Sequence, residues 1–112
     1  MIKRIWRGWT TPENADKYQQ LLHDHVFPGI EGKNIPGHLS IELLRMAGED
    51  EVEFVVIMAF ESVQNVIDFQ GEDYARGYIP EEARKVLKRW DEYASHYEAI
   101  TQTLQNTKLR AV

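Results

Sequence analysis

The hydrophobic and polar positions of the chain repeat with two periods, and each period predicts one kind of element. Residues 2–10 (IKRIWRGWT) are rich in β-branched and aromatic side chains, which predicts a strand. From Ala15 to Val26 an apolar side chain recurs every three or four positions, so we expect a helix with one apolar face. Pro12 suits the start of this helix, and Pro28 followed by glycine predicts its end.

The second half of the chain repeats the two patterns. Two strands are expected at residues 38–46 and 52–60, and the short loop between them predicts antiparallel pairing. We expect Ser62 to cap a short helix. After an irregular link, Pro80 is expected to open another helix whose apolar face extends to Trp90.

A last strand is expected at residues 92–103, which completes the order β-α-β-β-α(α)-β. This order is that of the α+β class with a ferredoxin-like split β-α-β sheet, in which four antiparallel strands carry helices on one face. We expect a single domain over residues 1–103 and a loosely ordered tail over residues 104–112.

The strand expected at residues 52–60 is unusual because it is apolar on both faces. Its first face carries Val52, Phe54, Val56, Met58 and Phe60, and its second carries Glu53, Val55, Ile57 and Ala59. A sheet that helices cover on one face should alternate apolar and polar residues. We therefore expect a homodimer in which a second copy covers the other face.

Composition excludes several classes of function. With 43% hydrophobic and 28% charged residues the chain has an ordinary globular composition, and the absence of cysteine excludes disulfides and thiolate chemistry. A net charge of -5 without a basic stripe argues against nucleic-acid binding. No apolar run approaches the roughly 20 residues of a membrane span, and no signal sequence is apparent, so we expect a cytoplasmic protein that does not bind membranes.

The sequence HDH resembles a metal motif, but its spacing argues against one. On a helix His23 and His25 point about 200° apart, so they cannot share an ion. We expect His25 on the apolar face and His23 in solvent. No metal and no cofactor are expected, since phosphate-binding and dinucleotide motifs are also absent from the sequence.

The stretch WDEYASHYEAI contains the best candidates for chemistry. Strand alternation places His96 and Glu98 on one face as neighbours, and a carboxylate beside an imidazole can raise its pKa and fix its tautomer, as a general base requires. The alternative is an ion pair across the strands with Arg4 or Arg7, which contributes little if it is exposed.

Aromatic residues gather on the expected strands. They are Trp6, Trp9, Phe54, Phe60, Tyr93 and Tyr97. They either pack in the core and dimer interface or form the wall of an apolar pocket, the usual make-up of a small-molecule site. His38 opens the second strand, where it either faces a ligand or lies at the surface.

Two segments, FPGIEGKNIPGHLSIELLR and AFESVQNVIDFQGEDYARGYIPEEARKVLKRWDEYASHYEA, resemble the antibiotic biosynthesis monooxygenase family. The resemblance covers about residues 2–100. It implies a dimeric α+β barrel with a cavity in each subunit. Some members oxidise polyketide-like aromatics with oxygen and no cofactor, others cleave haem, and others bind or isomerise small molecules.

The chain departs from the haem-cleaving members of that family. These carry an Asn on the first strand, a Trp before the second helix and a His near its end. Here residues 2–10 lack Asn, Phe60 stands where the Trp is expected, and VIDFQGEDY lacks His. The resemblance therefore argues against haem degradation, and what carries over is the His96-Tyr97-Glu98 strand.

Three hypotheses follow. The first is a cofactor-independent monooxygenase acting on a small aromatic or quinone-like compound, with His96 as base, Glu98 as its orienter, and Arg7 or a tyrosine stabilising the developing anion. The second is a non-catalytic dimeric barrel that binds an apolar small molecule. The third is a structural dimer with a filled interior.

Overall fold

The computed structural model describes residues 1–104, and its centre is an antiparallel sheet. The strands are β1 (Ile2–Thr10), β2 (His38–Ala47), β3 (Val52–Phe60), β4 (Arg89–Trp90) and β5 (Ser95–Glu98). They lie in the order β2-β3-β1, and both β4 and β5 pair with the free edge of β1. The α+β ferredoxin-like class predicted from the element order is confirmed.

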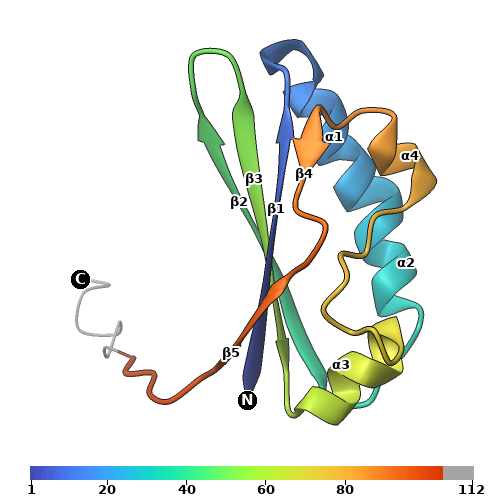
Figure 1. The fold of residues 1–112 in the computed structure, drawn as a ribbon, viewed down its shortest axis with the longest axis vertical. Coiled ribbons are helices and arrows are strands. Elements are labelled where there is room, and N and C mark those ends of the chain that lie inside the picture. Colours follow the sequence, from blue (N-terminus) through green and yellow to red (C-terminus); the bar gives the residue numbers. More distant parts are fainter. Residues whose placement is uncertain (105–112) are drawn as a thin grey trace, which may run out of the picture.

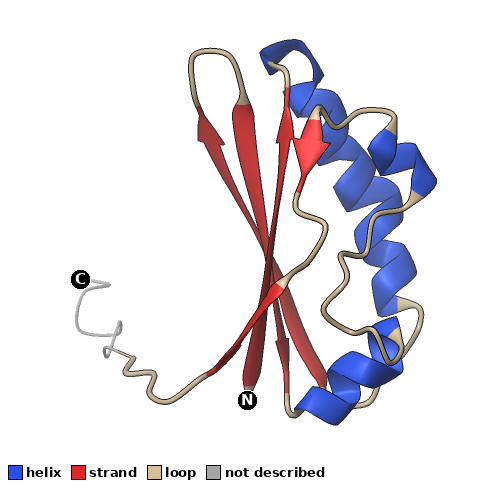
Figure 2. Ribbon diagram, in the orientation of Figure 1, coloured by secondary structure: helices blue, strands red, loops and turns tan. Residues whose placement is uncertain are grey.

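All the helices lie on one side of this sheet (Figure 1; Figure 2). They are η1 (Pro12–Asn14), α1 (Ala15–Leu21), η2 (Leu22–Val26), α2 (Phe27–Glu31), α3 (Val63–Gln70) and α4 (Glu81–Arg84). Ser62 and Asn65 form a capping box at the start of α3, as the sequence predicts for Ser62. No helix of residues 1–104 is long and apolar enough to cross a bilayer.

The first long helix does not end at Pro28, and that prediction was wrong. The chain passes through a wider π turn, η2, in which the Phe27 N–H donates to the Leu22 carbonyl, and then continues to Glu31. Proline lacks an N–H and its ring collides with the carbonyl four residues earlier, so a wide turn just before it relieves the conflict. His25 is exposed rather than on the apolar face, because Leu22 and Val26 take the buried positions of that turn.

The C-terminal third also differs from the sequence prediction. The helix α4 is one turn long, and Trp90 lies in β4 opposite Gly8. The last strand is only Ser95–Glu98, because the residues before it pair with the link 71–80 instead of with β1: the Ala94 N–H donates to the Ala75 carbonyl. The tail expected at residues 104–112 lies outside the described residues from residue 105 onward.

The side of the sheet that faces away from the helices carries apolar side chains. We call this the open face. Cross-strand register places Ile5, Leu44, Met46, Val55, Ile57 and Tyr97 on it. Leu44, Met46 and Tyr97 are 45%, 64% and 57% exposed, and no other element within residues 1–104 covers them. A contiguous apolar surface of this kind is typical of a protein contact, and the homodimer stays a prediction.

Candidate functional site

A small apolar cavity lies between the sheet and the long helix, which α1, η2 and α2 form together over residues 15–31. Its volume is about 40 Å³, and since one water needs about 10–15 Å³, it has room for about three waters. It is lined by Arg4, Trp6, Tyr18, Leu22, Val26, Phe27, Ile30, Val56, Met58, Tyr78, Ile79, Pro80 and Ala83. Arg4 is the one charged side chain among these lining residues.

Strand alternation and helical spacing together build the walls. Arg4 and Trp6 point from β1 toward the helices, and they are paired across the strands with Met58 and Val56 of β3. Above them the long helix presents one side chain every four residues, from Tyr18 to Ile30. The floor of the cavity is therefore sheet and its roof is helix.

Trp6 forms a rigid part of the floor. Its Nε1 donates a hydrogen bond of 2.7 Å to the Asp91 carbonyl. A Cβ atom on Gly77 would lie 2.8 Å from Nε1, and one on Gly8 would lie 2.6 Å from the Cη2 atom of the ring. The indole thus fits because both neighbours are glycines, and larger residues there would force it to move.

Arg4 is a buried cation at the cavity wall. Only 3% of the residue is exposed. Its Nη1 donates to the Tyr74 carbonyl at 2.5 Å, its Nη2 donates to the Arg76 carbonyl at 2.7 Å, and its Cζ lies 5.6 Å from the centre of the Phe69 ring. Burial lowers the pKa of Arg4 to about 10, so the guanidinium remains charged at neutral pH.

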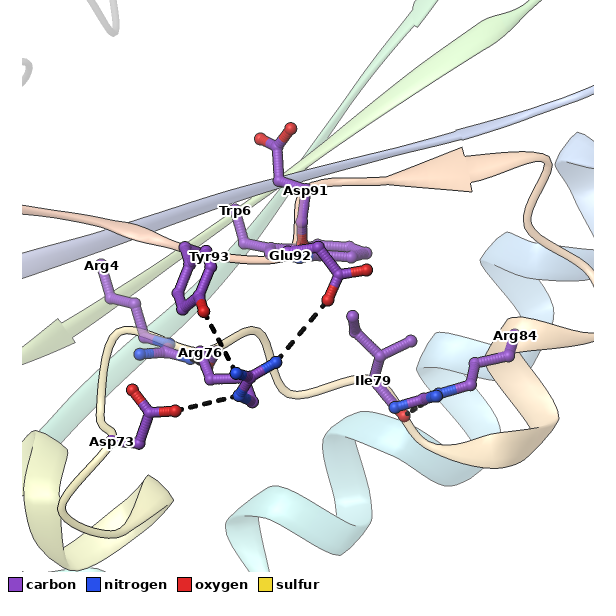
Figure 3. A network of polar contacts seen from close by, with 9 residues as sticks. All are labelled: Arg4, Trp6, Asp73, Arg76, Ile79, Arg84, Asp91, Glu92 and Tyr93. Atoms are coloured by element: carbon purple, nitrogen blue, oxygen red, sulfur yellow. Dashed lines mark hydrogen bonds and ion pairs between the residues drawn. The ribbon is translucent and has the colours of Figure 1, made fainter.

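The carboxylates of Asp73 and Glu92 turn toward Arg76 instead. Arg76 pairs with Asp73 at 2.9 Å and with Glu92 at 3.7 Å, and it donates to the Tyr93 hydroxyl at 3.1 Å (Figure 3). Within residues 1–104, no Asp or Glu oxygen lies within 4.0 Å of a nitrogen of Arg4. Among the described residues, therefore, no carboxylate neutralises the positive charge of Arg4.

His96 lies directly opposite Arg4 in the pairing of β5 with β1. Its Nε2 is 2.9 Å from Nη1 of Arg4, and because arginine can only donate, Nε2 accepts and the ring proton is on Nδ1. Its ring also packs edge-on against Tyr74, with 5.2 Å between ring centres. Burial and then the charge of Arg4 lower the pKa of His96, which keeps the imidazole neutral at pH 7.

The lowered pKa of His96 predicts a dependence of stability on pH. The folded state resists protonation of this ring. The stability that the neutral ring contributes is therefore lost as the pH falls below the unfolded pKa of about 6.5 toward the lower folded pKa. Between about pH 7.5 and 5.5, the melting temperature of the native protein should fall further than that of His96→Gln, which retains an acceptor for Arg4. Equal losses in thermal melts of the two proteins would contradict this assignment.

The structure does not bring the predicted catalytic group of His96, Glu98 and Arg7 together. His96 and Glu98 do share a face of β5, but Glu98 is exposed. Arg7 lies on the open face, where it pairs with Glu53 at 3.4 Å. Arg4 and Arg7 are three positions apart on β1, so their side chains point to opposite faces of the sheet. The arginine on the same face as His96 and directly opposite it is Arg4.

The aromatic candidates separate into three environments. Of them only Trp6 lines the cavity, whereas Phe54 and Phe60 are fully buried in the core behind it. The His38 ring packs 5.1 Å from that of Phe60, near the start of β2. Tyr93 and Tyr97 are 54% and 57% exposed.

Several lining residues were not singled out in the sequence. The roof residues Tyr18, Leu22 and Val26 form an apolar helical stripe, a pattern that a solid core also gives. Tyr78 and Ile79 belong to the link expected to be irregular, where a run of tyrosine, isoleucine and proline was the available signal. Within residues 1–104, no three His, Asp or Glu side chains are grouped so that they could hold a metal ion.

Comparison with known proteins supports the fold. No protein-family model matches the chain, and a search of curated proteins finds no match. Among solved structures, the chain is similar to a crystal structure of an MhuD point mutant with two manganese protoporphyrin IX molecules bound per active site. The TM-score is 0.61 at 18% identity, over 94% of this chain and 100% of that one. The fold is therefore the ferredoxin-like one that the order of the elements predicts.

Proposed function

We propose that the protein takes up a small aromatic compound in this cavity and oxygenates it without a cofactor. The observation that carries the proposal is an apolar cavity with a rigid indole on its floor and a single buried guanidinium in its wall. An apolar pocket with few convergent polar groups is the usual make-up of a small-molecule site.

The chemistry that suits these groups is oxidation through a substrate anion. Loss of a proton from a hydroquinone or anthrone gives an electron-rich anion that can reduce oxygen directly. In an anthrone the methylene becomes a carbonyl: one oxygen atom enters the product, the other leaves as water, and the substrate supplies all four electrons. A hydroquinone gives a quinone instead, and oxygen takes up its two electrons and two protons as hydrogen peroxide. The Arg4 guanidinium would stabilise the anion, and the neutral His96 would accept the proton once Arg4 turns from Nε2 to the substrate.

A ligand of this size requires the cavity to widen. About 40 Å³ accommodates waters but not an aromatic ring, so part of the wall must move. The roof crosses the π turn η2, where the α-helical hydrogen-bond register is interrupted, and such turns are frequent at functional sites. The similar MhuD structure, with its two porphyrins, supports the view that this fold can hold flat aromatic molecules.

The second candidate is a barrel that binds an aromatic compound without changing it. The hydrogen bond from Arg4 to Nε2 of His96 favours it, because that bond occupies the lone pair that a base would use. His96 is also not among the residues that line the cavity.

Two measurements distinguish the candidates. Quenching of Trp6 fluorescence by an anthrone or a naphthohydroquinone tests binding, with Trp6→Phe identifying the signal against the other two tryptophans. Oxygen consumption above the rate without protein tests turnover. Quenching without oxygen consumption would favour the second candidate, a protein that binds the compound without changing it. Absence of both would contradict the proposed function.

A further inference from the structure

We infer that the ligand of this cavity is an aromatic oxyanion, a ring that carries a carboxylate or an ionised phenol, and that its charge pairs with Arg4. The inference rests on the proposed function in one respect: an aromatic compound must enter the cavity. It does not depend on whether that compound is then oxidised.

The charge of the cavity wall is unbalanced among the described residues. Arg4 is 3% exposed and has no carboxylate within 4.0 Å among residues 1–104. Its partners are two carbonyls and an imidazole, which satisfy N–H groups but leave the charge uncompensated. Burying an unpaired charge is costly, so a buried cation at a cavity wall indicates a use for its charge.

Arg4 also keeps N–H capacity that its bonds to the described residues do not use. The side chain lines the cavity, and its hydrogen bonds to the protein use Nη1 and Nη2 but not Nε. No Asp or Glu is among the described lining residues, so an entering anion meets no negative side chain in the wall. In such a poorly solvated place a charge-assisted hydrogen bond is stronger than in water.

A second cation lies at the edge of the same aromatic wall. The Lys33 ammonium is 5.1 Å from the ring centre of Tyr78, which lines the cavity, and 5.5 Å from that of Phe69. Phe69 therefore has both Arg4 and Lys33 near its ring. Two cations thus lie beside these rings in a chain whose net charge is -5, and their charges favour an anionic ligand over a neutral one at this wall.

A purely structural role for Arg4 is the competing explanation. The guanidinium holds the carbonyls of Tyr74 and Arg76, so it could serve only to fix the link 71–80 against the sheet. Loss of that role would lower stability and weaken binding of every ligand equally. The ratio of affinities for a charged and a neutral ligand of the same shape separates the two roles. If Arg4 only fixes the link, replacing it leaves this ratio unchanged.

The experiment compares 2-naphthoate with its neutral isostere 2-naphthamide by titration calorimetry. We expect the native protein to prefer the carboxylate by at least about tenfold. In Arg4→Gln the two affinities should become equal, and Arg4→Lys should restore part of the preference. The control Arg7→Gln removes an arginine from the same strand but from the open face, and it should keep the preference. Circular dichroism checks that each variant is folded.

The outcomes separate this inference from the proposed function. If the native protein binds both naphthalenes equally well, the oxyanion inference is wrong and the apolar cavity stands. If it binds neither ligand while folded, both ideas fail. If Arg4→Gln does not fold, the native ratio and Arg4→Lys still decide: no preference in either protein overturns the inference. A second titration with 4-nitrophenol, below and above its own ionisation, tells whether an ionised phenol is accepted as well as a carboxylate.

Discussion

Replacing Ile57 with Glu is expected to abolish the homodimer. Ile57 lies in the middle of β3 on the open face, between Ile5 and Glu42 of the adjacent strands. If two copies pack through this face, the substitution buries an uncompensated carboxylate, and two-fold symmetry introduces it twice. A penalty of about 4 kcal/mol or more weakens association about a thousandfold, so light scattering at micromolar concentration should report monomers or unfolded chains.

The control places the same kind of change where no contact is expected. Val63 is 37% exposed in the first turn of α3, on the helical side of the sheet, and a carboxylate there is favoured by the helix dipole. Val63→Glu should therefore remain dimeric. A native protein that is monomeric in the same measurement, or an Ile57→Glu variant that remains a stable dimer, would show that the open face is not the interface.

The sheet was readable from the sequence because its signals are local. β-Branched and aromatic residues define β1 and β3 at the bounds that the structure has, 2–10 and 52–60. The ends of the long helix and of the last strand were not readable, because distant or unusual partners decide them. Pro28 is tolerated through a π turn, and the residues before β5 pair with the link 71–80 instead of with β1.

The candidate site was readable only in part for a similar reason. Residue types pointed to His96. The alternative, an ion pair across the strands with Arg4 or Arg7, is not among the ion pairs of residues 1–104; instead the register of β5 against β1 places His96 beside Arg4, whose Nη1 donates to Nε2. The carboxylate predicted as the partner of His96 is exposed at Glu98. An apolar stripe such as that of the long helix gives the same pattern whether it closes a core or roofs a cavity, so the cavity needed the structure.

Filling the cavity should weaken ligand binding strongly without affecting the dimer. Val56 lies on β3 opposite Trp6 and lines the cavity from the sheet side. In Val56→Phe the ring would occupy most of the roughly 40 Å³ of empty space, and any overpacking would cost about 1–3 kcal/mol. We expect the affinities for 2-naphthoate and 2-naphthamide to fall together by at least about tenfold, whereas loss of the Arg4 charge lowers only the first.

The adjacent residue on the same strand gives a matched control. Val55 points to the open face, so Val55→Phe adds the same ring to the other side of the sheet and leaves the cavity unchanged. That variant should bind both naphthalenes as the native protein does, while its dimer equilibrium shifts. If Val56→Phe binds ligand normally and Val55→Phe does not, the binding site lies between the sheets of the two subunits rather than beneath the long helix. Arg4 is then a structural residue.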